Sequence, residues 1–275
     1  MKHLFERAVS IYRNNGLIDL YRAIRRFVIY GSFRNELLNL LPATERFIRF
    51  YVQVGRKIRP TKFTDADPLK ILWVNPNKIT YNVNSPRIPL RFGKVYAGNW
   101  DKTDLKFKDR TVFQSLSSHF INGVPWEKTE YYQSKKRKLE QGKSTRGCTT
   151  IDDLPVYFDR IDTLYKRIDK NGYKTQRQLA SEYPEATKRE NLDSPTPGTN
   201  EIGVCIGRDG ELIRGYRGEH RLVIAKILDI ERVPVQVLVR HSEWQRIRDH
   251  LRTKGRSAIS ASIIDWTNNS EVHPD

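Results

Sequence analysis

The sequence predicts an α+β fold, because two different hydrophobic periodicities occur along one chain. Short runs rich in β-branched and aromatic residues predict strands at 70–74, 91–96, 201–206, 211–216 and 233–239. Apolar residues spaced three and four apart predict helices at 17–30, 35–54, 111–121, 151–171 and 221–228. Apolar residues make up 38% of the chain and charged residues 29%, which is enough for a core with a strongly solvated surface. We therefore expect a small mixed sheet with helices around it.

Residues 1–60 are predicted to form a basic region with two amphipathic helices. This region holds 12 Lys and Arg residues against 4 Asp and Glu residues. The helix predicted at 17–30 has arginines beside its apolar stripe, and Pro42 interrupts the second helical stretch. A basic helix with a wide apolar stripe is typical of a segment that lies on an anionic membrane. A helix packed on the protein's own core has the same periodicity, so both interpretations remain open.

Proline and glycine divide the rest of the chain into segments. The stretch 56–67 predicts a linker, and the proline-rich stretch 182–200 predicts a loop. The helix at 151–171 is expected to end at Gly172, and the basic run 134–138 predicts a solvated helix face. We accordingly expect three parts, which are the basic helical region at 1–60, a domain at 68–245 and a basic C-terminal tail at 246–275.

The composition excludes several classes of protein. No apolar run approaches the roughly 18 residues of a membrane-spanning helix, and the charged N-terminus is unlike a secretory signal. Cys148 and Cys205 are too few and too far apart for a disulfide framework or a zinc site, so we expect a cytoplasmic protein with reduced thiols. The net charge of +17 implies an anionic partner, which is nucleic acid, anionic lipid or a phosphorylated substrate.

The residues that point most directly to chemistry lie between 201 and 241. A hairpin that turns at Asp209-Gly210 is followed by Gly218-Glu219-His220-Arg221 and by a predicted helix. A glycine lets backbone N–H groups approach an anion, and the start of a helix adds its positive dipole end. Arg221 would chelate phosphate oxygens and His220 would donate to another. Alternatively, Gly218 only permits the turn and Arg221 pairs with a nearby carboxylate.

This run resembles the ParB/sulfiredoxin-like superfamily in the order of its parts, which are a hairpin, a Gly-x-x-Arg turn, a helix with Ala225-Lys226 and a strand that begins Val233-Pro234-Val235. The resemblance implies a ParB/sulfiredoxin-like core that binds a nucleoside triphosphate, ATP or CTP, with Mg²⁺. It places the phosphates at Gly218, Glu219, His220 and Arg221. Further candidates for the binding site are Arg217, Lys226, Arg240 and His241.

Members of this superfamily differ in function. Sulfiredoxins carry a reactive cysteine in the turn, where this chain has Glu219, so their chemistry is not expected. Partition proteins bind DNA through further domains, whereas only 34 residues follow His241, so this role is disfavoured but stays open. A third branch phosphorylates free serine and has an aspartate just before the glycine of the turn, where this chain has Arg217.

Phosphoryl transfer needs a carboxylate that orients the acceptor, and Mg²⁺ held on the phosphate oxygens. The candidates are Glu201, which opens a predicted strand, Asp101, which follows Gly98-Asn99-Trp100, and third Glu219. Each of them has the simpler interpretation of a surface carboxylate or a loop cap. The sequence does not identify the residues that would contact the metal.

Together these patterns predict an ATP-dependent phosphotransferase of the ParB/sulfiredoxin-like superfamily. We expect it to be peripheral on the inner face of the membrane and to act on a sugar, a glycan-lipid or another small hydroxyl acceptor. The membrane contact would come from residues 1–60. The alternatives are a nucleotide-gated DNA-binding module and a ParB-like nuclease.

Overall fold

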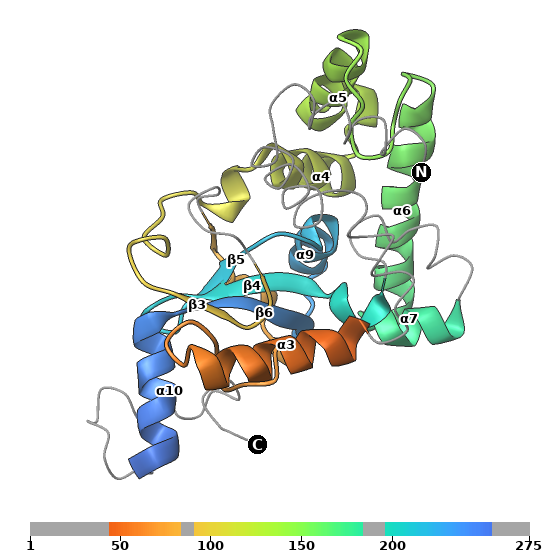
Figure 1. Cartoon of the computed structure of the whole chain (residues 1–275). Coiled ribbons are helices and arrows are strands. Elements are labelled where there is room, and N and C mark those ends of the chain that lie inside the picture. The colour runs from red at the N-terminus through yellow and green to blue at the C-terminus, as the bar shows by residue number, and fades with distance from the viewer. Residues whose placement is uncertain (1–43, 84–90, 184–195, 255–275) are drawn as a thin grey trace, which may run out of the picture.

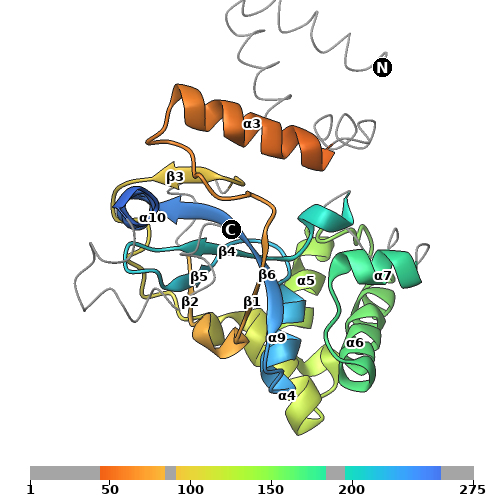
Figure 2. The same ribbon diagram turned by 90° about the horizontal axis from the view of Figure 1, so that it is seen from below.

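The computed structural model describes residues 44–83, 91–183 and 196–254. A mixed six-stranded sheet forms the centre, with helices on both of its faces (Figures 1 and 2). The strands are β1 (Ile71–Val74), β2 (Tyr81–Asn82), β3 (Lys94–Tyr96), β4 (Ile202–Ile206), β5 (Leu212–Arg214) and β6 (Val233–His241). The helices are α3 (Thr44–Ile58), α4 (Thr111–Asn122), α5 (Glu130–Glu140), α6 (Asp153–Asn171), α7 (Gln176–Glu182), α9 (Glu219–Ile227) and α10 (Ser242–Lys254). The α+β class predicted from the sequence is confirmed.

The sheet is arranged around β6, all nine residues of which are buried. Its strand order is β1-β6-β4-β5-β2, and β3 pairs with β6 beyond the end of β1. Strands β4 and β6 are parallel, whereas β4 and β5 form the antiparallel hairpin predicted at Asp209-Gly210. Helix α9 connects β5 to β6, so its first turn follows the end of the hairpin directly.

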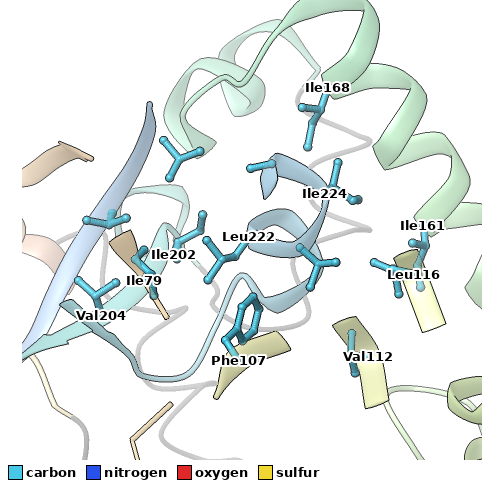
Figure 3. Close-up of a cluster of buried hydrophobic side chains, with 14 of the residues drawn as sticks. Ile79, Phe107, Val112, Leu116, Ile161, Ile168, Ile202, Val204, Leu222 and Ile224 are labelled. Carbon is cyan, nitrogen blue, oxygen red and sulfur yellow. The ribbon is translucent and has the colours of Figure 1, made fainter. Parts of the chain in front are cut away.

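One face of the sheet is covered by α9, and α4 and α6 pack on the outer side of that helix. Leu222, Val223, Ile224 and Ala225 of α9 are fully buried, as expected for a helix that is apolar around most of its circumference. Figure 3 shows the side chains of α9 between those of β4 and those of α4 and α6. Burial of each large apolar side chain stabilises the fold by about 1.5–3 kcal/mol, so this cluster fixes the position of α9.

Helix α3 covers the opposite face of the sheet (Figure 2). Close contact depends on two glycines, because a Cβ at Gly55 would lie 2.5 Å from the ring of Phe63 and one at Gly93 would lie 2.4 Å from Val52. Phe63 and Thr64 are buried, and the Thr64 amide donates to Gly93. The prediction of a linker at 56–67 is therefore wrong, because this segment packs against the sheet.

The C-terminal residues also differ from expectation. Residues 246–254, which we expected in a tail, continue α10, and Trp244 and Arg248 of this helix are buried. Arg248 forms an ion pair of 3.2 Å with Asp65 and so joins α10 to the segment that follows α3. The helix predicted at 17–30 and most of the loop predicted at 182–200 lie outside the described residues. Within the described ranges, no helix has the length and apolar character needed to cross a membrane.

Candidate active site at the start of α9

The turn before α9 has a backbone that favours glycine. Gly218 has a φ of 66° and precedes the first residue of the helix. A Cβ at this position would lie 2.8 Å from Cγ1 of Ile202 and 3.0 Å from its Cα. Glycine is thus required by the backbone conformation and by the close approach of the turn to β4. Because Gly218 has no side chain to cap the helix, the first N–H groups of α9 are not capped by the residue before them.

Glu219, the first residue of α9, lies among three arginines. Its carboxylate accepts from Nε of Arg110 at 2.5 Å, and its Oε2 lies 3.5 Å from Arg214 and 3.7 Å from Arg146. Burial alone would raise the pKa of Glu219, but the nearby guanidinium groups of Arg214 and Arg110 lower it. The carboxylate is therefore ionised at neutral pH.

His220 is held by two tyrosines from other helices. Its Nε2 lies 3.0 Å from the hydroxyl of Tyr131 on α5 and 3.4 Å from that of Tyr157 on α6. The two hydroxyls lie 2.6 Å apart. Burial raises the pKa of Tyr131 to about 12 and that of Tyr157 still further, so both remain protonated and able to donate. The imidazole is thus fixed beside the start of α9.

Lys135 on α5 adds a buried cation. Its amine lies 4.3 Å from the ring centroid of Tyr157 and 4.8 Å from that of Tyr131, distances at which a cation is attracted to an aromatic face. Burial lowers the pKa of Lys135 to about 8, so the amine is mainly charged at pH 7. Our prediction of a solvated face at 134–138 is wrong at this residue, which is 3% exposed.

We call these residues the α9 site, which comprises Arg110, Lys135, Arg146, Arg214, Glu219 and His220. Three arginines contact a single carboxylate at the positive end of a helix dipole, and Lys135 adds a fourth cation beside Tyr131 and Tyr157. Arg110 and Arg146 have side chains that are 44% and 49% exposed, whereas those of Glu219 and Arg214 are 7% exposed. An anion arriving from solvent would therefore meet the arginines before it met the carboxylate, so the arrangement favours an anionic ligand.

Strained backbone also occurs at this site. In the described part of the chain, three residues other than glycine have a positive φ, namely Arg146, Arg217 and Asp229. Arg146 belongs to the α9 site, and Arg217 directly precedes Gly218. A left-handed conformation costs a residue with a Cβ about 1–2 kcal/mol, and such strain occurs most often at ligand sites and active sites.

Arg221 has a different role from the one we predicted. Its guanidinium donates to the carbonyl of Asn200 at 2.5 Å and lies 3.8 Å from Glu201. Glu201 is 1% exposed and accepts from the Gln176 amide, the first of α7, at 2.7 Å. Burial raises the pKa of Glu201 to about 7. The pairing of Arg221 with a carboxylate, which the sequence left open, is the arrangement that the structure contains.

Asp101, Arg240 and His241 do not lie at the Gly218 turn. Asp101 binds Arg208, which follows the C-terminal end of β4, through contacts of 2.8–2.9 Å. Burial would raise the pKa of Asp101, but the hydrogen bonds from Arg208 lower it to about 2. Arg240 pairs with Ile206 at the same end of β4, and His241 lies 2.9 Å from the carbonyl of Gly98. Glu201 directly precedes the N-terminal end of β4. Roughly 20 Å of extended chain therefore separates Glu201 from Arg208, the partner of Asp101.

The remaining candidates are near the turn but directed elsewhere. The Arg217 guanidinium contacts the carbonyl of Thr199 and lies 5.2 Å from the ring centroid of Phe92. Lys226 is two turns further along α9 and lines a separate pocket. Of the predicted site residues, the structure brings Gly218, Glu219 and His220 into the α9 site, with Arg221 and Glu201 forming a buried pair behind it.

The sequence does not predict which residues lie beside Gly218, Glu219 and His220. Arg110, Tyr131, Lys135, Arg146 and Tyr157 belong to a segment that precedes the hairpin by many residues, and no spacing rule connects them to Gly218. Arg214 lies within the recognised run but was assigned only to a strand.

Metal binding by this site would require phosphate as well as protein. Among the described residues, no group of three or more His, Cys, Asp or Glu side chains could hold a metal ion. Magnesium commonly uses one or two carboxylates together with substrate phosphates and water, and Glu219 is the carboxylate that the α9 site offers. A search of known protein families, curated proteins and solved structures finds no match to this chain.

Proposed function

We propose that this protein binds the phosphates of a nucleoside triphosphate, ATP or CTP, at the α9 site and transfers a phosphoryl group to a hydroxyl acceptor. The observation that carries the proposal is the group of three arginines around Glu219 at the start of α9, with Lys135 beside the tyrosines that hold His220. Phosphoryl transfer depends mainly on positioning and on electrostatic stabilisation of the phosphoryl oxygens. A site rich in arginine and lysine at a helix N-terminus provides both. The resemblance to the ParB/sulfiredoxin-like superfamily favours the same ligand.

The exposed arginines would make the first contacts with the ligand. Arg110 and Arg146 can each donate to two phosphate oxygens, and the start of α9, with its positive dipole end, lies beside them. His220, fixed by Tyr131 and Tyr157, would donate to a further oxygen. Mg²⁺ bound to the phosphates would neutralise part of their charge, and Glu219 is the residue that would hold it.

The carboxylate that orients the acceptor is then Glu219 rather than Glu201 or Asp101. Glu201 is enclosed by Arg221 and the amide of Gln176, so it positions α9 against β4 and α7. Asp101 lies at the opposite end of β4 with Arg208. Glu219 is ionised and adjacent to the exposed cations, so it can accept a hydrogen bond from the acceptor hydroxyl and orient it.

Calorimetry with ATP and with CTP tests the binding step. Arg146→Gln removes one charge-assisted contact to phosphate, which is worth about 1.5–3 kcal/mol, so the affinity should fall about 10- to 100-fold. Arg246→Gln is the matched control, because Arg246 is also an exposed arginine paired with a glutamate but lies on α10. Equal affinities of the wild type and Arg146→Gln for both nucleotides would contradict the assignment.

Turnover assays separate the enzyme from the alternatives. The wild type, with labelled ATP or CTP and Mg²⁺, should phosphorylate a sugar, a glycan-lipid or another hydroxyl compound from a membrane extract. Nucleotide-dependent retention of DNA without turnover would instead favour a nucleotide-gated DNA-binding module. Cleavage of the DNA would favour a ParB-like nuclease.

We also propose that α3 places the protein on an anionic membrane surface. Ile48 and Val52 of this helix pack on the sheet, whereas a second apolar stripe is exposed. Phe47, Phe50 and Ile58 in that stripe are 52%, 62% and 71% exposed. The exposed Arg46 and Lys57 supply charges that attract anionic lipid. This location would hold the protein at the inner face of the membrane, where lipid-linked acceptors occur, with the α9 site on the other side of the sheet (Figure 2).

A further inference from the structure

A second pocket lies on the C-terminal half of α9. Its volume is about 450 Å³, and it opens between the segment around β2, the short helix Phe107–Asp109, and α4 and α9. Three lysines and three aromatic residues line it, namely Lys106, Lys108, Lys226, Tyr81, Phe107 and Phe113. Pockets that bind small molecules commonly have volumes of about 300–1,000 Å³ and combine apolar walls with a few polar groups. The size and the composition therefore suit a small ligand.

Lys226 supplies a half-buried positive charge to this pocket. Burial lowers its pKa to about 8, so the amine is mainly protonated at pH 7. Within the described ranges, no ion pair or side-chain hydrogen bond involves this amine, and no carboxylate lines the pocket. A partly desolvated cation without a counter-ion is unfavourable, and an anionic group in the pocket would compensate for it.

Phe113 and Tyr81 form an aromatic wall beside this charge, and Phe107 behind them is part of the core. Phe107 is 1% exposed and belongs to the core cluster under α9, as Figure 3 shows. It contacts Phe113 edge to face at 5.6 Å, and the amine of Lys226 lies 6.0 Å from the Phe107 ring centroid. Fixed aromatic rings favour a planar ring in offset or edge-to-face contact.

We propose that this pocket binds a phosphate monoester of a compound with a planar ring. The phosphate would lie between Lys226, Lys106 and Lys108, and the ring would lie against Phe113 and Tyr81, the two lining aromatic residues that keep accessible surface. Phosphate suits the site better than a single carboxylate, because three lysines line the pocket and lysine binds phosphate as a point charge. The proposal does not depend on nucleotide binding at the α9 site, whose cations come from other residues.

Phenyl phosphate is a suitable probe. Phenol, which has only the ring, and inorganic phosphate, which has only the charge, are its control ligands. Binding is followed in nuclear magnetic resonance spectra through the backbone amides of Thr80 and Lys108, which report on this pocket alone. Phenyl phosphate should bind at least about 10-fold more tightly than either control ligand, because it uses both the cations and the wall. Lys226→Met should weaken binding about 10-fold or more, while Lys128→Met, which removes an exposed lysine outside the pocket, should not.

Two further variants keep the result interpretable. Thr80→Trp fills the mouth of the pocket from an exposed position and should abolish the shifts without disturbing the core. Arg146→Gln alters the α9 site and should leave these shifts unchanged. The proposal is overturned if phenyl phosphate binds no better than phenol, or if neither Lys226→Met nor Thr80→Trp changes its affinity. Benzoate that binds as tightly as phenyl phosphate would also overturn the preference for phosphate.

Discussion

At the residue scale, burial decides what each charged side chain does. Arg221 and Arg146 are both close to the start of α9, but Arg221 is enclosed with Glu201 whereas Arg146 is half exposed. The sequence identifies an arginine three residues after Gly218, yet it contains no information on which carboxylate will lie beside it. The same sequence pattern is therefore compatible with an arginine that contacts phosphate and with an arginine in a buried ion pair.

Glu201 leads to a prediction about pH. Its pKa rises from 4.5 to about 7 on folding, so the folded protein keeps a proton that the unfolded chain releases. The contribution of this group to stability is complete below about pH 4.5 and is lost as the pH rises to 7. Glu201→Gln keeps the shape and the acceptor for Gln176 but does not titrate. The stability of the wild type relative to this variant should fall by about 2–3 kcal/mol between pH 4.5 and 8.

Urea unfolding at the two pH values measures this difference, and taking the variant as the reference cancels the other titrating groups. A relative stability that is independent of pH would show that Glu201 is ionised throughout. Nucleotide affinity should change little in Glu201→Gln, because this carboxylate positions α9 and does not contact the ligand.

At the element scale, the sequence predicts most of the sheet and its main helices. The strands at β1, β3, β4, β5 and β6 and the helices α4, α6 and α9 were predicted within a few residues of their bounds. Helix α7 was missed, although Thr175 and Gln178 form a capping box that is recognisable in sequence. Helix α10 was missed because its polar composition hides the stripe of Trp244, Ile247 and Leu251. The contacts of α5 with the α9 site depend on tertiary packing, which local patterns do not encode.

The junction between β4 and α9 can be tested at Gly218. An alanine there would adopt an unfavourable φ, at about 1–2 kcal/mol, and would overlap with Ile202, at about 1–3 kcal/mol more. Gly123 is a matched control, because its φ is 67° but no atom lies within 4 Å of the position of a Cβ. Gly218→Ala should therefore lower the free energy of unfolding by about 2–5 kcal/mol and Gly123→Ala by about 1–2 kcal/mol. Equal losses in urea unfolding would contradict the importance of the close approach to β4.

At the scale of the whole molecule, the net charge of +17 predicts an anionic partner but not its position. The sheet separates α3 on one face from α9 on the other (Figure 2). Residues of α9 contribute to the α9 site and to the lysine-lined pocket, so both belong to the second side. The amphipathic pattern over α3 is compatible with packing on the core and with binding to lipid. In the structure, one apolar stripe of α3 packs on the core and a second apolar stripe is exposed. The sequence could not distinguish these two stripes, because both follow the same helical period.

Vesicle flotation tests the exposed stripe of α3. The wild type should float with vesicles that contain anionic phosphatidylglycerol and much less with vesicles of phosphatidylcholine alone, because binding combines apolar contact with attraction to charge. Replacement of both Phe47 and Phe50 by serine should reduce binding about 10-fold or more, since each exposed aromatic ring contributes on the order of 1 kcal/mol or more when it enters the interface. Ile151→Ser and Val156→Ser form the control pair, because they remove exposed apolar side chains from the segment around the start of α6. Equal flotation of the two double variants would show that α3 is not the membrane contact, and unchanged flotation on phosphatidylcholine alone would show that charge does not contribute.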